Sequence, residues 1–122
     1  MSAGATSARP LYTAMVTRKH PRFSVSLSIT LVHKDHFRHA GSVRNISAKG
    51  CRVDCIISPF TGMQLTVQLH IPGEPKPILI DNAAVRWSGS AGIGLEFLTV
   101  APLHQDRLDH MIRQLQPKTV LQ

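Results

Sequence analysis

Apolar and polar residues alternate strictly just after residue 23. One set of alternate positions is apolar, namely Val25, Leu27, Ile29 and Leu31. The intervening set is hydroxylated, namely Ser24, Ser26, Ser28 and Thr30. Because successive side chains of a strand point to opposite faces, this pattern predicts a strand with one buried face.

Similar short apolar stretches recur along the chain. They predict five further strands, over residues 39–46, 51–55, 65–71, 78–87 and 93–97. Between them lie a polar, histidine-rich loop over 33–39, a turn over 45–50, and breaks rich in Pro, Gly and Ser over 58–62, 72–77 and 88–92. Six short strands separated in this way favour an antiparallel barrel or a sandwich.

The hydrophobic period changes near the end of the chain. Pro102 suits the first turn of a helix, and Pro117 would end it. Between them an apolar stripe has helical spacing, formed by Leu108, Met111, Ile112 and Leu115. We expect this stripe to pack on the domain.

The length and composition suit one globular domain. The chain has 122 residues, of which 43% are hydrophobic and 17% charged, so it is neither disordered nor too small to bury a core. We expect the domain to span residues 18–116, with a flexible arm over 1–17 and a tail over 117–122. No stretch approaches the roughly 20 apolar residues of a membrane span.

The charge balance is one-sided. Fourteen Lys and Arg stand against seven Asp and Glu, giving a net charge of +7. A surplus of this kind favours anionic partners such as nucleotides, nucleic acid or a membrane surface. Four Phe, one Tyr and one Trp are few stacking platforms for a nucleic-acid-binding barrel, so nucleic acid is the less favoured partner.

Two cysteines, Cys51 and Cys55, lie four residues apart in one predicted strand. At ~3.3 Å per residue they would be about 13 Å apart, which is too far for a disulfide. Two free thiols favour a reducing compartment, and we expect a cytoplasmic protein.

Catalytic and metal chemistry find little support in the sequence. The seven carboxylates are scattered, and no spacing pairs a cysteine with a histidine as a nucleophile. His33, His36, His39 and Cys51 could be drawn as a zinc site, but their spacing does not match the usual paired ligands. We therefore expect no enzyme, no catalytic residues and no metal, and we interpret the histidines as a solvated loop.

Two short motifs carry the strongest signal. Arg18-x-x-x-Arg22 precedes the first predicted strand, and Asn45-x-Ser47-x-x-Gly50 lies between the second and third. The arginine fork can donate paired hydrogen bonds to phosphate oxygens or to guanine O6 and N7, and it stacks on bases. Asn45 and Ser47 can bond a base edge, and Gly50 permits a turn and a close backbone approach.

In this order and setting, the two motifs resemble those of the PilZ family of cyclic di-GMP receptors. That family is marked by R-x-x-x-R followed by D/N-x-S-x-x-G. Val85-Arg86-Trp87 and Gly92-Ile93-Gly94-Leu95-Glu96-Phe97 are also similar to its last hairpin. The resemblance covers about residues 18–116. It implies a six-stranded antiparallel β-barrel with a C-terminal α-helix, and cyclic di-GMP as the ligand.

The resemblance implies that Arg18, Arg22, Asn45, Ser47 and Gly50 form the ligand site. Further candidate contacts lie nearby, namely Lys19, Arg52, Arg86 and Trp87. For Trp87 the favoured interpretation is a place in the core.

The chain departs from the family pattern at two positions. Thr17 stands where many members carry a further arginine, and Asn45 stands where Asp is frequent. A neutral amide still accepts from guanine N–H, but without charge assistance. Both departures favour weaker binding.

Two functions remain open at this point. In the favoured one, the chain is a cyclic di-GMP receptor that changes conformation on binding and signals through a protein partner, for which motility, pilus or exopolysaccharide machinery are the candidates. In the alternative, it is a PilZ-like interaction module that binds no nucleotide. The motifs are compatible with one bound ligand or with an intercalated pair.

Overall fold

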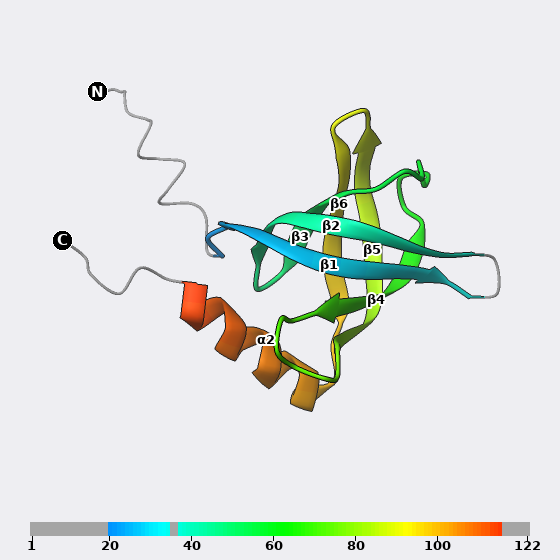
Figure 1. Ribbon diagram of the computed structural model, residues 1–122. Coiled ribbons are helices and arrows are strands. Elements are labelled where there is room, and N and C mark those ends of the chain that lie inside the picture. Colours follow the sequence, from blue (N-terminus) through cyan, green and yellow to red (C-terminus); the bar gives the residue numbers. More distant parts are fainter. Residues whose placement is uncertain (1–19, 35–36, 116–122) are drawn as a thin grey trace, which may run out of the picture.

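The computed structural model describes residues 20–34 and 37–115. These residues form six strands and one helix, labelled in Figure 1. The strands are β1 (Phe23–His33), β2 (Phe37–Ser47), β3 (Gly50–Asp54), β4 (Gln64–His70), β5 (Ile78–Gly89) and β6 (Gly92–Thr99), and the helix is α2 (Pro102–Leu115).

The strands close into a barrel with the order β1-β2-β3-β6-β5-β4, and β4 pairs with β1 to complete it. Every neighbouring pair is antiparallel. The predicted six-stranded antiparallel barrel is therefore confirmed, and closure removes the exposed edges that a sandwich would leave.

The core of the barrel comes from the alternation read in the sequence. On β1, Ile29 and Leu31 are fully buried, whereas Ser24, Ser26 and Ser28 are exposed. Each of the other five strands likewise contributes buried apolar residues to the same cluster. Burying such side chains stabilises the fold by roughly 1.5–3 kcal/mol each.

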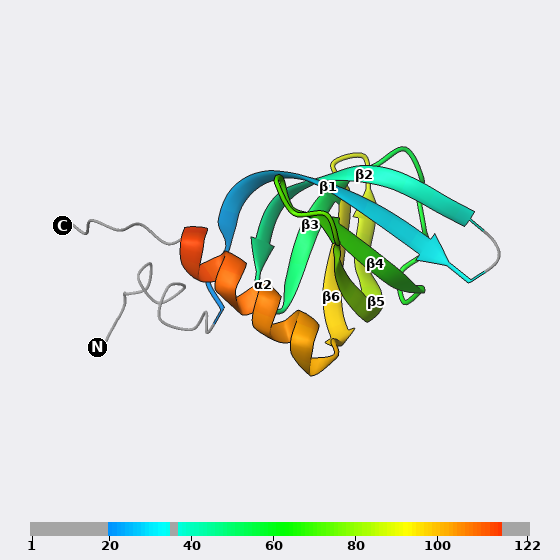
Figure 2. The same cartoon turned by 60° about the horizontal axis from the view of Figure 1, so that its bottom comes forward.

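Helix α2 begins at Pro102, as predicted, and closes the end of the barrel where β1 begins and β4 ends (Figure 2). Leu108 and Ile112 are buried in the core cluster, and Met111 and Leu115 pack against it. The predicted apolar stripe thus packs on the domain.

Polar contacts also fix α2 to the chain around β5. The backbone N–H of Leu79 donates to His104 Nδ1 at 3.1 Å. The Arg107 guanidinium donates to the carbonyls of Pro77 (2.9 Å) and Lys76 (2.7 Å) and to Glu74 Oε1 (2.7 Å). Side chains of α2 therefore satisfy backbone groups that would otherwise lack partners.

The predicted loop over 33–39 was wrong in its length. β1 runs to His33 and β2 starts at Phe37, and these two residues pair across the hairpin. The Phe37 ring contacts both His33 and His39, with ring centroids 5.3 and 5.4 Å apart. The ladder continues through this mostly polar stretch because Phe37 packs against the core and its ring contacts His33 across the hairpin. His36 lies outside the described residues.

The turn predicted over Asn45–Gly50 is also shorter than expected. β2 continues to Ser47 and β3 starts at Gly50, so Asn45 and Ser47 belong to a strand. The register shifts between Val43 and Asn45, and such a bulge alters which side chains face outward. β3 ends at Asp54, so the predicted strand over 51–55 ends one residue early, and Cys51 and Cys55 are free thiols, as predicted.

Candidate ligand-binding site

The structure joins the two sequence motifs through Arg22 and Asn45. Arg22 directly precedes β1, and its Nη1 donates to Asn45 Oδ1 at 2.7 Å. The pairing of Ser24 with Asn45 across β1 and β2 brings these side chains together. Both groups lie at the surface, where a ligand can reach them.

Arg18 and Lys19, the other predicted residues of the first motif, lie outside the described residues, as does Thr17. The predicted arm over 1–17 and tail over 117–122 lie outside them as well. The described part of the first motif is therefore its second arginine, Arg22.

Ser47 is 4% exposed, and its hydroxyl already has partners in the turn. Ser47 Oγ accepts a hydrogen bond from the Lys49 backbone N–H at 3.1 Å and donates to the Gly50 carbonyl at 3.4 Å. In this conformation Ser47 shapes the turn that carries the second motif. A direct contact with a ligand stays a prediction.

Gly50 is required by a close strand crossing. A Cβ at this position would overlap the backbone carbonyl of Leu95 on β6, the strand that pairs with β3 there. Glycine therefore lets β3 and β6 approach within the barrel. The expected role in approaching a ligand stays a prediction.

Trp87 is not a core residue, contrary to the favoured interpretation. Its side chain is 43% exposed, because the register of β5 against β6 shifts between Val85 and Trp87. That irregularity breaks the alternation and leaves both Arg86 and Trp87 outside. The indole lies against Gly94 of β6, where any Cβ would overlap the ring. Gly94 thus creates space for a flat aromatic surface on the barrel.

Arg52 and Arg86, two tentative candidates, reach the same surface from β3 and β5. Arg52 Nη2 donates to the Ala91 carbonyl at 3.0 Å, and its Nε is buried without a hydrogen-bond partner. Arg86 Nε pairs with Glu96 Oε1 at 2.5 Å. We call the outer surface carrying Arg22, Asn45, Arg52, Arg86 and Trp87 the arginine face.

Two adjacent hollows lie on the arginine face and share Arg22, Trp87 and Gly94. The Arg52 hollow measures about 150 Å³ and is completed by Asn45, Cys51 and Arg52. The Glu96 hollow measures about 330 Å³ and is completed by Ser47, Lys49, Arg86, Leu95 and Glu96. All the predicted site residues that the structure describes, except Gly50, therefore line these hollows.

Hollows of about 370 and 590 Å³ lie elsewhere, beside α2 and the chain between β4 and β5. They contain none of the predicted site residues, and Arg107, the arginine that lines both, is bonded to the protein itself. Motif chemistry, rather than volume, therefore identifies the arginine face as the candidate site.

The charge of the arginine face favours an anion. Among the described residues that line its two hollows, four are cationic, Arg22, Lys49, Arg52 and Arg86, and one is acidic, Glu96. Beneath them, burial raises the pKa of the Cys51 thiol to about 12, and the charge of Arg22 acts in the opposite direction. Cys51 is therefore a neutral packing residue at pH 7.

Sequence reasoning did not select Glu96 or Lys49 as site residues. Lys49 lies within the second motif, and strand alternation was the available signal for Glu96. Ile93, Leu95 and Phe97 face the core, so Glu96 must face outward. What the sequence could not supply was the neighbour of Glu96, because the β5–β6 register decides that it meets Arg86.

Over residues 20–34 and 37–115, no group of three or more His, Cys, Asp or Glu side chains is arranged to hold a metal ion. Cys51 is fully buried in the core, so it is not placed to join His33 and His39 in the zinc site considered above. In the same part of the chain, no helix has the length and apolar character to cross a membrane.

Comparison with known proteins identifies the family. The sequence profile of the PilZ domain matches residues 17–114. The chain therefore belongs to the PilZ domain family. Among curated proteins, no sequence matches it.

Solved structures support the fold. The Bacillus subtilis inhibitor of motility MotI/DgrA is 24% identical with a TM-score of 0.62, and the match covers 80% of this chain and 50% of that one. The PilZ domain of YcgR from Escherichia coli, solved with c-di-GMP, is 15% identical with a TM-score of 0.61 and coverages of 81% and 91%. The PilZ domain of CeSA from a cellulose-synthesizing bacterium is 11% identical with a TM-score of 0.63 and coverages of 78% and 97%. The chain thus spans half the length of MotI/DgrA and nearly all of the two isolated PilZ domains.

Proposed function

We propose that this protein is a cytoplasmic, non-catalytic receptor for cyclic di-GMP that signals through a protein partner. The observation that carries the proposal is the hydrogen bond between Arg22 and Asn45, which unites the two PilZ motifs on one cationic surface. The YcgR PilZ domain, similar in fold, was solved with this ligand.

The arginine face offers matching chemistry to each part of cyclic di-GMP. Its phosphates would meet the guanidinium groups of Arg22 and Arg52, because arginine forks donate paired hydrogen bonds to phosphate oxygens. A guanine would stack on the exposed face of Trp87, and stacking of this kind is worth roughly 1–3 kcal/mol per base. Arg18 and Lys19, just before the described part of the first motif, would add positive charge.

Signalling would follow from where the ligand binds. Arg22 precedes β1, so a ligand held by Arg22 and Asn45 would tie the preceding chain to the barrel. The new surface would then be recognised by a partner, for which motility, pilus or exopolysaccharide machinery are the candidates. Binding with a change of surface needs no reacting group.

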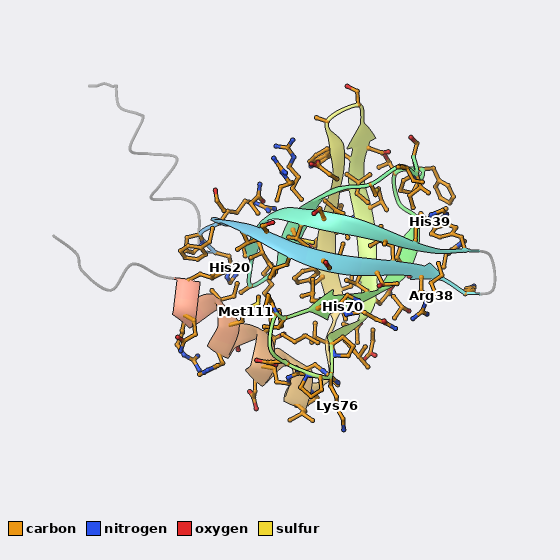
Figure 3. The ribbon with its side chains drawn as sticks, in the orientation of Figure 1. His20, Arg38, His39, His70, Lys76 and Met111 are labelled. Atoms are coloured by element: carbon orange, nitrogen blue, oxygen red, sulfur yellow. The ribbon has the colours of Figure 1, made fainter. Side chains whose placement is uncertain are left out.

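Arg22→Ala tests the proposal by titration calorimetry with cyclic di-GMP. Loss of a paired contact of about 1–3 kcal/mol predicts a 5- to 150-fold weaker affinity. Arg38→Ala is the matched control, because it removes the same charge from an exposed position on β2 that donates only a long 3.3 Å bond to Gln68. Figure 3 shows Arg38 at the opposite end of the β1–β2 hairpin from His20. A folded Arg22→Ala variant with wild-type affinity would contradict the proposed site.

A second candidate function is a PilZ-like interaction module that binds no nucleotide. The burial of Ser47 favours it, because the hydroxyl of the second motif is already bonded within its own turn. The same titration separates the two functions. Wild-type protein that shows no binding heat at high micromolar cyclic di-GMP would support the interaction module.

A further inference from the structure

Glu96 stands out on the arginine face because it is acidic. Among the described residues lining the two hollows, it is the one carboxylate beside four cations. An acid in a site for a doubly anionic ligand opposes the phosphates unless its charge is compensated or its oxygens have another task.

Arg86 compensates the charge of Glu96 and also orients it. The Arg86 Nε–Glu96 Oε1 contact of 2.5 Å joins neighbouring strands β5 and β6. Glu96 is nevertheless exposed, and a carboxylate has about four lone-pair sites over two oxygens. The bond to Arg86 therefore leaves acceptor capacity on Glu96 that faces the hollow.

The residues around Glu96 can accommodate a base whose edge bonds to the carboxylate. The Glu96 hollow also contains Trp87, whose exposed indole offers a stacking surface. The β2–β3 turn borders this hollow through Ser47 and Lys49, and the Phe97 backbone N–H holds the turn to β6 by donating to the Lys49 carbonyl at 2.7 Å. A purine on Trp87 would thus have the Glu96 carboxylate and the second motif beside it.

Guanine and adenine present different edges to a carboxylate. Guanine offers two adjacent donors, N1–H and the exocyclic N2–H₂, which match the two oxygens of a carboxylate. Adenine presents its N1 lone pair in the same place, and that lone pair repels a carboxylate. Polar sites built for one hydrogen-bond pattern reject analogues that leave their groups unpaired.

We propose, on the basis of the cyclic di-GMP binding proposed above, that Glu96 is a specificity-determining residue that selects guanine over adenine. Its carboxylate, held by Arg86, accepts hydrogen bonds from the Watson–Crick edge of a guanine stacked on Trp87. The Arg52 hollow contains no acid among its described lining residues and accommodates the phosphates instead.

Glu96→Gln tests the inference by calorimetric titration with two probes, cyclic di-GMP and cyclic di-AMP. The amide retains the shape of the side chain but loses the charge-assisted pair. We expect cyclic di-GMP affinity to fall about 5- to 150-fold, as for loss of one bidentate base contact. Cyclic di-AMP affinity should stay unchanged or rise, so the preference for guanine collapses.

Asp54→Asn is the matched control. Asp54 is another carboxylate paired with an arginine across neighbouring strands, with Arg44 Nε–Asp54 Oδ2 at 3.3 Å. It lines neither of the two hollows. Its substitution removes the same charge and should leave the ratio of the two affinities at the wild-type value.

The outcomes separate the inference from the function on which it rests. Equal tightening for both probes in Glu96→Gln would mean that Glu96 only opposes phosphate, and it would overturn the inference. If the ratio of the cyclic di-GMP and cyclic di-AMP affinities is unchanged in Glu96→Gln, the inference is also overturned. The proposed function would still stand in that case if the wild-type protein binds cyclic di-GMP. Wild-type protein that binds neither probe would refute the proposed function, and guanine selection with it. Thermal melting verifies that the variants are folded.

Discussion

Two arginines that line different hollows of this protein have contrasting environments. Arg107 of α2 donates to two backbone carbonyls and to the carboxylate of Glu74, and its side chain is 25% exposed. Arg22 is exposed and donates to the neutral amide of Asn45. The guanidinium of Arg107 is occupied by the protein, whereas that of Arg22 retains donors for a ligand.

This contrast separates a structural arginine from the proposed binding arginine, although both line hollows. An arginine with a full set of internal acceptors fixes one element to another. An arginine with one neutral acceptor is oriented but not neutralised, which suits recognition of an anion. The following predictions test this division and the arginine face that carries Arg22, from the largest expected effect to the smallest.

Gly50→Ala tests whether β3 and β6, two strands that carry the arginine face, must lie in close contact for the fold to be stable. The added methyl group would overlap the Leu95 carbonyl, so the strands must separate. Overpacking of this kind predicts a loss of about 3 kcal/mol in the free energy of unfolding, measured by urea denaturation. Gly89→Ala is the control, because a Cβ there meets no atom within 4 Å. Equal stability of the two variants would contradict the tight crossing.

Arg107→Ala should destabilise the fold without weakening ligand binding. It removes charge-assisted bonds to the Lys76 and Pro77 carbonyls, with an expected cost of about 2 kcal/mol. Arg113→Ala, at an exposed position in the last turn of α2, should cost much less. Thermal melting and cyclic di-GMP titration together check the prediction. Weaker binding by a stable Arg107→Ala variant would remove the contrast with Arg22.

Trp87→Ala should weaken binding of cyclic di-GMP with little effect on stability. The indole is 43% exposed and lies on Gly94, so its loss removes a stacking surface rather than a core residue. We expect about a 5- to 30-fold loss of affinity, from about 1–2 kcal/mol of stacking. Trp87→Phe should restore much of it. If Trp87→Ala instead unfolds the protein, the indole has a structural role and the arginine face loses its platform.

The buried thiol of Cys51 lies beneath the arginine face and should make the stability of the protein depend on pH. Burial raises its pKa from 9.0 to about 12, so the folded state keeps the proton at pH values where the unfolded thiol loses it. Its contribution to stability is therefore complete below pH 9 and declines between about pH 9 and 12, by up to about 1.4 kcal/mol per pH unit. The free energy of unfolding of Cys51→Ala should decline less steeply over this range. Parallel pH profiles for both proteins would contradict a buried thiol.

Much of the fold was predictable because it depends on local pattern. The alternation from Val25 to Leu31 gave β1, and the stripe through Leu108 and Ile112 gave the packed face of α2. The hairpin at His33 and Phe37 was missed because one apolar residue, Phe37, packs against the core and contacts the His33 and His39 rings, so the stretch shows no apolar alternation. Polar composition alone therefore did not distinguish a strand end from a loop.

The candidate site was predictable only as far as its motifs. Arg22 and Asn45 are far apart in the chain, and the resemblance of their two motifs to those of the PilZ family predicted that they belong to one site. The pairing of Glu96 with Arg86 and the exposure of Trp87 could not be predicted, because both depend on the irregular register of β5 against β6. A shift of one residue between paired strands changes which side chains face outward, and no local pattern records it.

Calorimetric titration of cyclic di-GMP into the wild-type protein tests the central claim most directly. The arginine face predicts saturable binding with a dissociation constant below about 100 μM, equivalent to at least about 5 kcal/mol of binding free energy. Heats of injection no larger than those of dilution, with protein that is folded by thermal melting, would contradict it.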